Sequence, residues 1–165
     1  SLKEEVAGPW TISFQEGRGG PAEPLTTDSL FDWTGSEDLH IKYFSGTATY
    51  KTTFKLKKLP ETPLYIDLGK VMVMARVKVN GQEVGGVWTA PYRLNISQAV
   101  RKGNNELEIE VVNNWRNRII GEKNLPESER FTFQTASYLN KDSELQSSGL
   151  LGPVQILSFP YLIIK

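Results

Sequence analysis

The chain has 165 residues, a length typical of a single domain, and its 39% hydrophobic and 23% charged residues are usual for a folded globular protein. Nineteen basic residues balance nineteen acidic ones, and no basic run stands out, so the charge pattern of a nucleic-acid or anionic-membrane binder is missing. The lack of cysteine excludes disulfides, thiol nucleophiles and Cys-based zinc sites. No stretch approaches the ~18 apolar residues of a transmembrane helix, and we expect the targeting sequence of an exported parent protein to lie outside this chain.

Alternation of apolar and polar residues is the main pattern along the chain. It occurs at 10–14, 48–56, 92–97 and 106–111. A period of two places every second side chain on the same face of a strand. Each segment is therefore predicted to be a strand with one buried and one solvated face, and Glu106, Glu108 and Glu110 are expected to face solvent.

Two further segments, 64–68 and 71–75, are almost continuously apolar. Such runs are typical of central strands that are covered on both faces. Asn80-Gly81 follows directly, and this pair accepts the positive φ angles of a type I′ turn. Residues 76–79 are therefore predicted to pair antiparallel with 82–87.

Helical signals are scarce. Residues 27–29 could cap one short turn before Leu30, and 96–100 could form another. The stretches 15–45 and 116–150 contain many turn-forming residues and are predicted to be excursions from a β scaffold. Together these patterns predict an all-β fold, a two-sheet antiparallel β-sandwich of the jelly-roll type, formed as one domain over 1–165.

An ordered series of short motifs runs through most of the chain. In chain order it reads YFSGTATY (43–50), DLGKV (67–71), VKVNG (77–81), WTAPYRL (88–94), GNNEL (103–107), VNNWRNR (112–118) and SGLLGPV (148–154). This series resembles the galactose-binding-like, "sugar-binding" jelly-roll domain of glycoside hydrolase family 2. It is similar above all to the C-terminal domain of the α-L-rhamnosidase-type enzymes of family 106.

The resemblance implies a non-catalytic accessory domain, a fragment of a larger multidomain glycoside hydrolase. Its partners would be the catalytic domain of the same polypeptide and an oligo- or polysaccharide, and the parent enzyme would be periplasmic or extracellular. Related jelly rolls hold a structural Ca²⁺ through loop carbonyls, whose ligands cannot be located in this sequence; no other cofactor is implied. Two alternatives remain open, an autonomous carbohydrate-binding module and a stand-alone hydrolase.

A stand-alone hydrolase would need its own catalytic groups. Glycosidases use two carboxyl groups about 5–10 Å apart. The loop carboxylates available are Asp32, Glu37, Asp38, Glu122, Glu127 and Glu129, and we expect them to be solvated surface residues. His40 is the only histidine, and we expect it in a surface loop because no Gly-x-Ser-x-Gly motif accompanies it. We therefore assign no catalytic residue and no metal-ligating side chain.

Carbohydrate contact is the more promising chemistry. Sugars stack an apolar face on an aromatic ring and offer hydroxyl groups to polar side chains. Two clusters combine these residue types: Trp88, Tyr92 and Arg93 in the first, and Asn114, Trp115, Arg116 and Arg118 in the second. A structural role is the alternative for both, since the tryptophans could fill the core and the arginines could fix the excursion over 116–150. The apolar tail, 157–164, is a candidate for a surface that contacts a neighbouring domain, or for a final edge strand.

Overall fold

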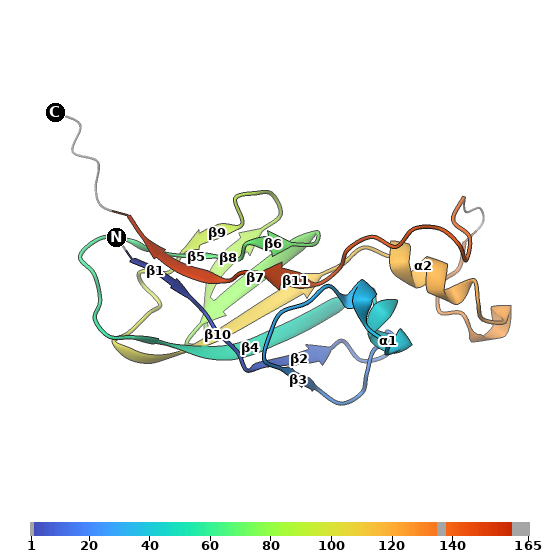
Figure 1. Ribbon diagram of the computed structural model, residues 1–165, viewed down its shortest axis with the longest axis horizontal. Coiled ribbons are helices and arrows are strands. Elements are labelled where there is room, and N and C mark those ends of the chain that lie inside the picture. Colours follow the sequence, from blue (N-terminus) through green and yellow to red (C-terminus); the bar gives the residue numbers. More distant parts are fainter. Residues whose placement is uncertain (1, 135–137, 160–165) are drawn as a thin grey trace.

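The computed structural model describes residues 2–134 and 138–159, which form two facing antiparallel sheets (Figure 1). The larger sheet has the strand order β3-β2-β4-β10-β7-β8. Its strands are β2 (Trp10–Phe14), β3 (Leu25–Thr27), β4 (Thr47–Leu56), β7 (Met74–Val79), β8 (Gln82–Val87) and β10 (Gly103–Val112). The predicted antiparallel β-sandwich is thereby confirmed.

The smaller sheet has the order β1-β12-β5-β9. It is formed by β1 (Leu2–Glu5), β5 (Leu64–Asp67), β9 (Arg93–Asn95) and β12 (Gln155–Ser158). A two-stranded ribbon, β6 (Lys70–Val71) with β11 (Leu150–Gly152), lies beside the sandwich. The first and last described strands pair with each other, since Leu2 lies opposite Ser158.

The core lies between the two sheets and follows the alternation seen in the sequence. Tyr50 of β4, Ile109 of β10 and Val77 of β7 are buried and lie side by side in register. On the opposite face of the same strands, the Glu108 carboxylate forms ion pairs with Lys51 and Lys78, whose Nζ atoms lie 3.2 and 3.0 Å from its oxygens. The period-two pattern therefore separates an apolar inner face from a charged outer face.

The hairpin between β7 and β8 forms as predicted. Asn80 and Gly81 have φ angles of 51° and 78°, the left-handed values that a type I′ turn needs. The Asn80 side chain also donates to the carbonyl of Ala99 and to Oδ1 of Asn105, at 2.8 and 2.9 Å. The turn is thus tied to the start of β10 as well as closing its own hairpin.

The observed strands differ from the prediction at three places. Residues 71–75 do not form one buried strand, because Val73 has a φ of 78° and is exposed between β6 and β7. The strand predicted over 92–97 is confined to β9. Of the tail 157–164, a candidate edge strand, residues 157 and 158 belong to β12, which lies between β1 and β5 and is no edge, and 160–164 lie outside the described residues.

The helical turns also differ from the prediction. Asp32 and Asp38, rather than 27–29, cap the short helices η1 (Trp33–Gly35) and α1 (Leu39–Lys42). Residues 96–100 form a hydrogen-bonded turn. The second excursion contains a helix that was not predicted, α2 (Arg116–Glu122), followed by η2 (Glu127–Glu129).

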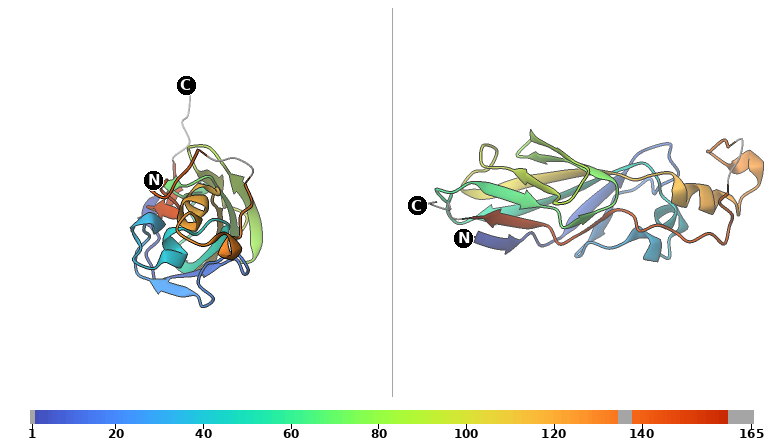
Figure 2. Two further views of the ribbon diagram at one scale, coloured as in Figure 1. Left: turned by 90° about the vertical axis from the view of Figure 1, so that its right-hand side faces the viewer. Right: turned by 90° about the horizontal axis from the view of Figure 1, so that it is seen from above.

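The molecule is elongated. The described termini lie together at one end and α2 lies at the other, as both side views show (Figures 1 and 2). Within 2–134 and 138–159, no helix has the length and apolar character needed to cross a membrane.

Candidate functional site

The first predicted sugar-contact cluster contains one free aromatic ring. Trp88 directly follows β8 and is 71% exposed. Tyr92 packs against the core, and Arg93 donates to Oδ2 of Asp67 from Nη2 at 2.6 Å and from Nε at 3.1 Å. The Arg93 guanidinium also lies 5.3 Å from the ring centre of Phe159. Arg93 is therefore held by the scaffold, and Trp88 is the member of this cluster that is available to a ligand.

Polar members of the second cluster hold the end of the second excursion, around residues 144–146, against the start of α2. Asn114 donates to Oε1 of Gln146 at 2.8 Å, and Arg116 donates twice to the carbonyl of Glu144, at 3.0 and 3.2 Å. Trp115, at the start of α2, is 42% exposed, and one of its ring faces is covered by Arg18 at 5.4 Å. These contacts match the structural alternative, while sugar contact by either cluster stays a prediction.

Arg118, the last member of the second cluster, is buried beside Glu122. Its Nε donates to Oε1 of Glu122 at 2.7 Å, and its guanidinium lies 4.7 Å from the ring centre of Phe131. The same carboxylate accepts the amides of Phe131 and Thr132, both at 3.0 Å, and the Thr132 hydroxyl. Burial raises the pKa of Glu122, but the hydrogen bonds from Thr132, Phe131 and Arg118 outweigh it and leave the pKa below its ordinary value.

This finding corrects the expectation that Glu122 is a solvated loop residue: it is buried on a helix. The sequence carried one signal for it, because Arg118 and Glu122 are spaced i,i+4 as ion pairs on helices are. The amides of Phe131 and Thr132 carried no such signal, because the turn that brings them back to α2 is not encoded by a local motif.

Asp32, also expected to be a solvated residue, is partly buried. Its Oδ1 accepts the amide and hydroxyl of Thr34 and the amide of Ser148, at 2.8–3.1 Å. Burial raises the pKa of Asp32, and these hydrogen bonds with one from Ser147 lower it below the ordinary value. An ionised carboxylate engaged in this way joins the two excursions and is poorly suited to act as a general acid.

The remaining carboxylates considered for catalysis, Glu37, Asp38, Glu127 and Glu129, are exposed as expected. His40 is exposed too, with Nδ1 3.2 Å from the carbonyl of Gly19. Among residues 2–134 and 138–159, no group of three His, Asp or Glu side chains is placed to hold a metal ion. A Ca²⁺ held by main-chain carbonyls stays a prediction.

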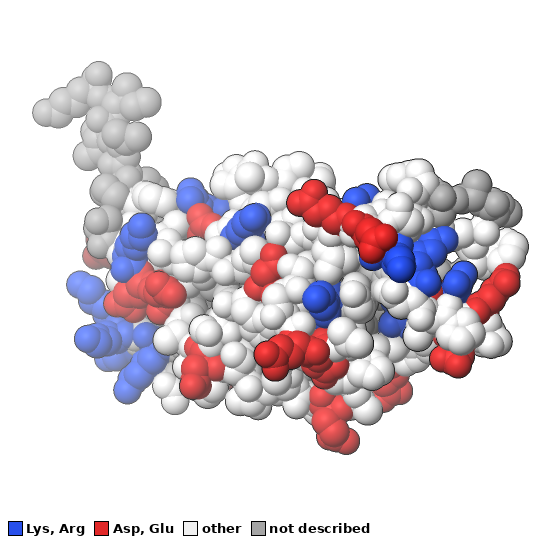
Figure 3. Space-filling model, turned by 45° about the vertical axis from the view of Figure 1, so that its right-hand side comes forward, with Lys and Arg blue, Asp and Glu red and all other residues white. Residues whose placement is uncertain are grey.

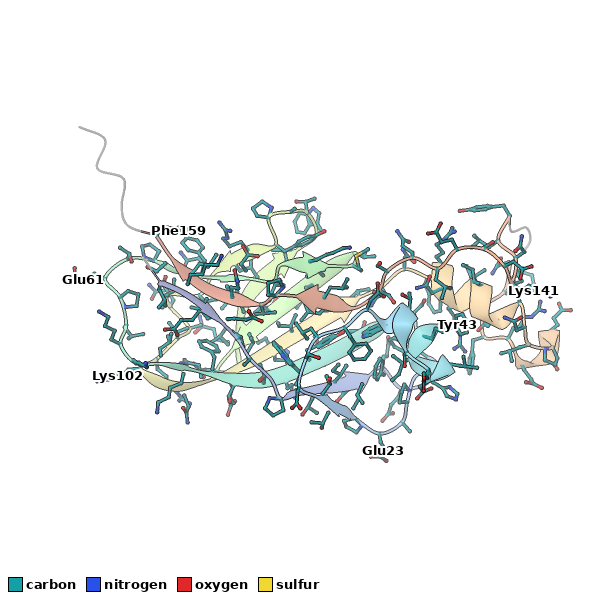
Figure 4. All side chains as sticks on the ribbon, in the orientation of Figure 1. Glu23, Tyr43, Glu61, Lys102, Lys141 and Phe159 are labelled. Atoms are coloured by element: carbon teal, nitrogen blue, oxygen red, sulfur yellow. The ribbon has the colours of Figure 1, made fainter. Side chains whose placement is uncertain are left out.

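Several hollows lie on the surface of the described residues. A groove of about 510 Å³ on the outer face of the larger sheet is lined by Lys51, Lys78 and Glu108, which already pair with one another. A cavity of about 620 Å³ lies between α1, α2 and the loop at Gly19. Its apolar lining includes Tyr43, on the side of α1 that faces α2 (Figure 4), together with Leu39, Leu125 and Phe131. None of these four residues was predicted from the sequence as a site residue, although Tyr43 begins the motif at 43–50.

Comparisons with known proteins agree with this architecture. Residues 28–146 match the family model described as "Glycosyl hydrolase 2 galactose-binding domain-like". A "Putative beta-glucuronidase" of Formosa agariphila is 40% identical over 182 aligned residues, which cover 92% of this chain and 15% of that protein. The structure of a rhamnosidase from Novosphingobium sp. PP1Y superposes with a TM-score of 0.86 at 41% identity, over 94% of this chain and 15% of the rhamnosidase.

A beta-glucuronidase of Ruminococcus gnavus matches 68% of this chain and 21% of its own, at 18% identity and a TM-score of 0.57, which is a likeness of fold alone. The chain spans about 15% of the length of the first two relatives. These findings confirm the resemblance drawn from the ordered motifs. Because the family model covers most of its residues, the chain belongs to the galactose-binding-like domains of glycosyl hydrolase family 2.

Proposed function

We propose that this chain serves as a non-catalytic accessory domain of a larger glycoside hydrolase, where it packs against the catalytic domain of the same polypeptide. The parent enzyme would act in the periplasm or outside the cell, as the resemblance to polysaccharide-degrading enzymes suggests. In this role the sandwich is a rigid body that braces the catalytic domain and holds loops near the substrate.

The observation that carries this proposal is the pattern of coverage. The match takes in 92–94% of this chain but 15% of each of two relatives named as glycosidases. The same sandwich therefore recurs as a minor part of much longer enzymes. The engagement of Asp32 and Glu122 in structural hydrogen bonds supports the same role, since neither carboxylate is left free for acid–base chemistry.

The test compares the 165-residue chain with the product of the complete gene. Both are assayed with chromogenic rhamnosides, galactosides and glucuronides. We expect turnover by the complete product alone, and a less stable or less active enzyme when 1–165 are deleted. Turnover by the isolated chain that disappears in Glu129→Gln or Glu127→Gln would instead establish a stand-alone hydrolase.

An autonomous carbohydrate-binding module is the second candidate, favoured by the exposed ring of Trp88. Isotope-labelled chain is titrated with rhamnose- and galactose-containing oligosaccharides at millimolar concentration and followed by NMR. Binding through this ring predicts shifts that Trp88→Ala abolishes and Trp115→Ala preserves. Unchanged spectra would leave the bracing role as the better description.

A further inference from the structure

Apolar side chains are exposed together at the α2 end of the molecule. Leu39, Leu125 and Phe131 line the 620 Å³ cavity. Phe131 also lines an adjoining hollow, together with Phe133. Phe131 and Phe133 are 64% and 89% exposed. These four residues make up the α2 face. These four exposed side chains line two adjoining hollows that share Phe131.

The α2 face is held in place by buried polar contacts. Glu122 accepts the amides of Phe131 and Thr132, which fixes the backbone on which Phe131 and Phe133 are mounted. Arg118 donates to Oε1 of Glu122, the oxygen that also accepts the Phe131 amide, and its guanidinium lies over the Phe131 ring. A buried, hydrogen-bonded ion pair that orders an exposed aromatic loop is costly to build and adds nothing to the core of the sandwich. The arrangement is therefore that of a preorganised contact surface.

The charges around this face favour a neutral, apolar partner. Glu129 and Lys123 lie beside the hollows, and both signs of charge border uncharged surface at this end of the molecule (Figure 3). Burial of exposed aromatic rings contributes about 25 cal/mol per Å², so rings as exposed as Phe133 represent a large gain on docking. Aromatic residues with a polar surround are typical of protein interfaces.

The occupant is argued from the length of chain in which this domain occurs. In two relatives the domain is 15% of the protein, so most of each polypeptide lies outside it. The described termini lie at the end opposite α2 (Figure 1). A neighbour joined covalently through the termini and contacting the α2 face would hold the domain at both ends, and the covalent link would raise the effective concentration for the apolar contact.

We infer that the α2 face is the surface through which this domain docks on another folded domain of its own polypeptide. This inference rests on the proposed accessory function and specifies its contact. Phe131 and Phe133 are the anchors, Leu39 and Leu125 extend the contact, and the Arg118–Glu122 pair positions them without touching the partner domain.

The lack of cysteine in this chain permits a direct test. Phe133→Cys and Leu39→Cys each introduce one thiol into the α2 face, and Trp88→Cys introduces the matched control at an exposed ring elsewhere. Alkylation rates are measured by peptide mass spectrometry, both in the 165-residue chain and in the complete gene product. Because labelling follows access, we expect it to slow on the order of tenfold or more at both α2-face positions in the complete product, with no change at Trp88→Cys.

Equal labelling at Phe133→Cys and Leu39→Cys in the two proteins would overturn the inference but leave the accessory function standing. The accessory function fails separately, if the complete gene encodes no further domain. Light scattering that shows a dimer of the isolated chain, dispersed by Phe133→Ser, would make a second copy the occupant. Saturable NMR shifts of Phe131 and Leu125 with a monosaccharide would make the cavity a sugar site. Either result overturns the inference.

Discussion

Glu122 is buried and ionised because its two oxygens accept hydrogen bonds from Arg118, Phe131 and Thr132. Removing one partner of such a pair leaves an uncompensated buried charge. We expect Glu122→Gln to lower the free energy of unfolding by ~3 kcal/mol, as measured by urea denaturation. The double variant Arg118→Met, Glu122→Gln is the control: it keeps an amide oxygen beside the Phe131 and Thr132 amides, removes the buried Arg118 charge, and should be more stable than Glu122→Gln alone. A double variant less stable than the single one would show that the pair is not the cause.

The same carboxylate predicts a pH dependence. The folded-state pKa of Glu122 lies below its ordinary value of 4.5, so its contribution to stability is present above that value and is lost as pH falls through the folded pKa. Between pH 5 and acid unfolding, the wild-type chain should therefore lose more unfolding free energy than Glu122→Gln does. Parallel pH profiles for the two proteins would contradict the assignment.

Gly149 occupies a position where a side chain has no room. Its φ is 92°, and a Cβ there would lie 2.7 Å from the buried Trp33 indole and 2.9 Å from the Tyr50 hydroxyl. Gly81 has a similar φ of 78° but open space around it, which makes it a matched control. Gly81→Ala should cost ~1–2 kcal/mol from backbone strain alone. Gly149→Ala should cost ~1–3 kcal/mol more because of overpacking, so equal losses in thermal unfolding would refute the overlap.

At the scale of elements, Asn105 joins the β7–β8 hairpin to the start of β10. Its buried amide group bonds to the backbone of Arg101 and Gly103 and accepts from Asn80. Asn105→Ala would leave several buried groups without partners, at ~1–3 kcal/mol for each. We expect a loss of at least ~2 kcal/mol in urea unfolding. The exposed neighbour Asn104, changed to Ala, should cost far less, and similar losses at both positions would contradict this role.

The strands with regular alternation could be predicted because side-chain periodicity and burial have the same cause. This holds for β2, β4 and β10, and for the Asn80-Gly81 turn, whose conformation is local. The helix α2 could not be predicted in this way. It is seven residues long, its N-cap residue Trp115 makes no side-chain cap, and contacts with Gln146 and Glu144 hold its first turn. The break at Val73 likewise depends on the ribbon partner β11, which is remote in sequence.

At the scale of the whole molecule, the candidate site likewise combines features that could be predicted from the sequence with features that depend on contacts between remote segments. The sequence predicted which residue types could contact a sugar, and Trp88 and Trp115 are indeed exposed. It could not show that Arg93 and Arg116 are engaged elsewhere, because Asp67 and Glu144 meet them only in the folded chain. The α2 face went unnoticed for the same reason, as its residues come from two excursions that meet at one end of the sandwich.

The pairing of the first and last described strands leads to a final prediction. β1 forms the edge of the smaller sheet, and its exposed residues Lys3, Glu4 and Glu5 give that edge charges. Charged edges prevent strand addition by other chains. Deleting residues 1–5 would leave β12 as the edge, and β12 carries the buried apolar side chains Ile156 and Leu157.

We expect this truncated chain to unfold at lower temperature and to associate at concentrations where the whole chain stays monomeric. Size-exclusion chromatography with light scattering, followed by a thermal melt, measures both effects. Glu4→Thr keeps the strand and removes one charge, so it should remain monomeric. A truncated chain that stays monomeric and melts unchanged would mean that β1 neither protects the β12 edge nor stabilises the smaller sheet.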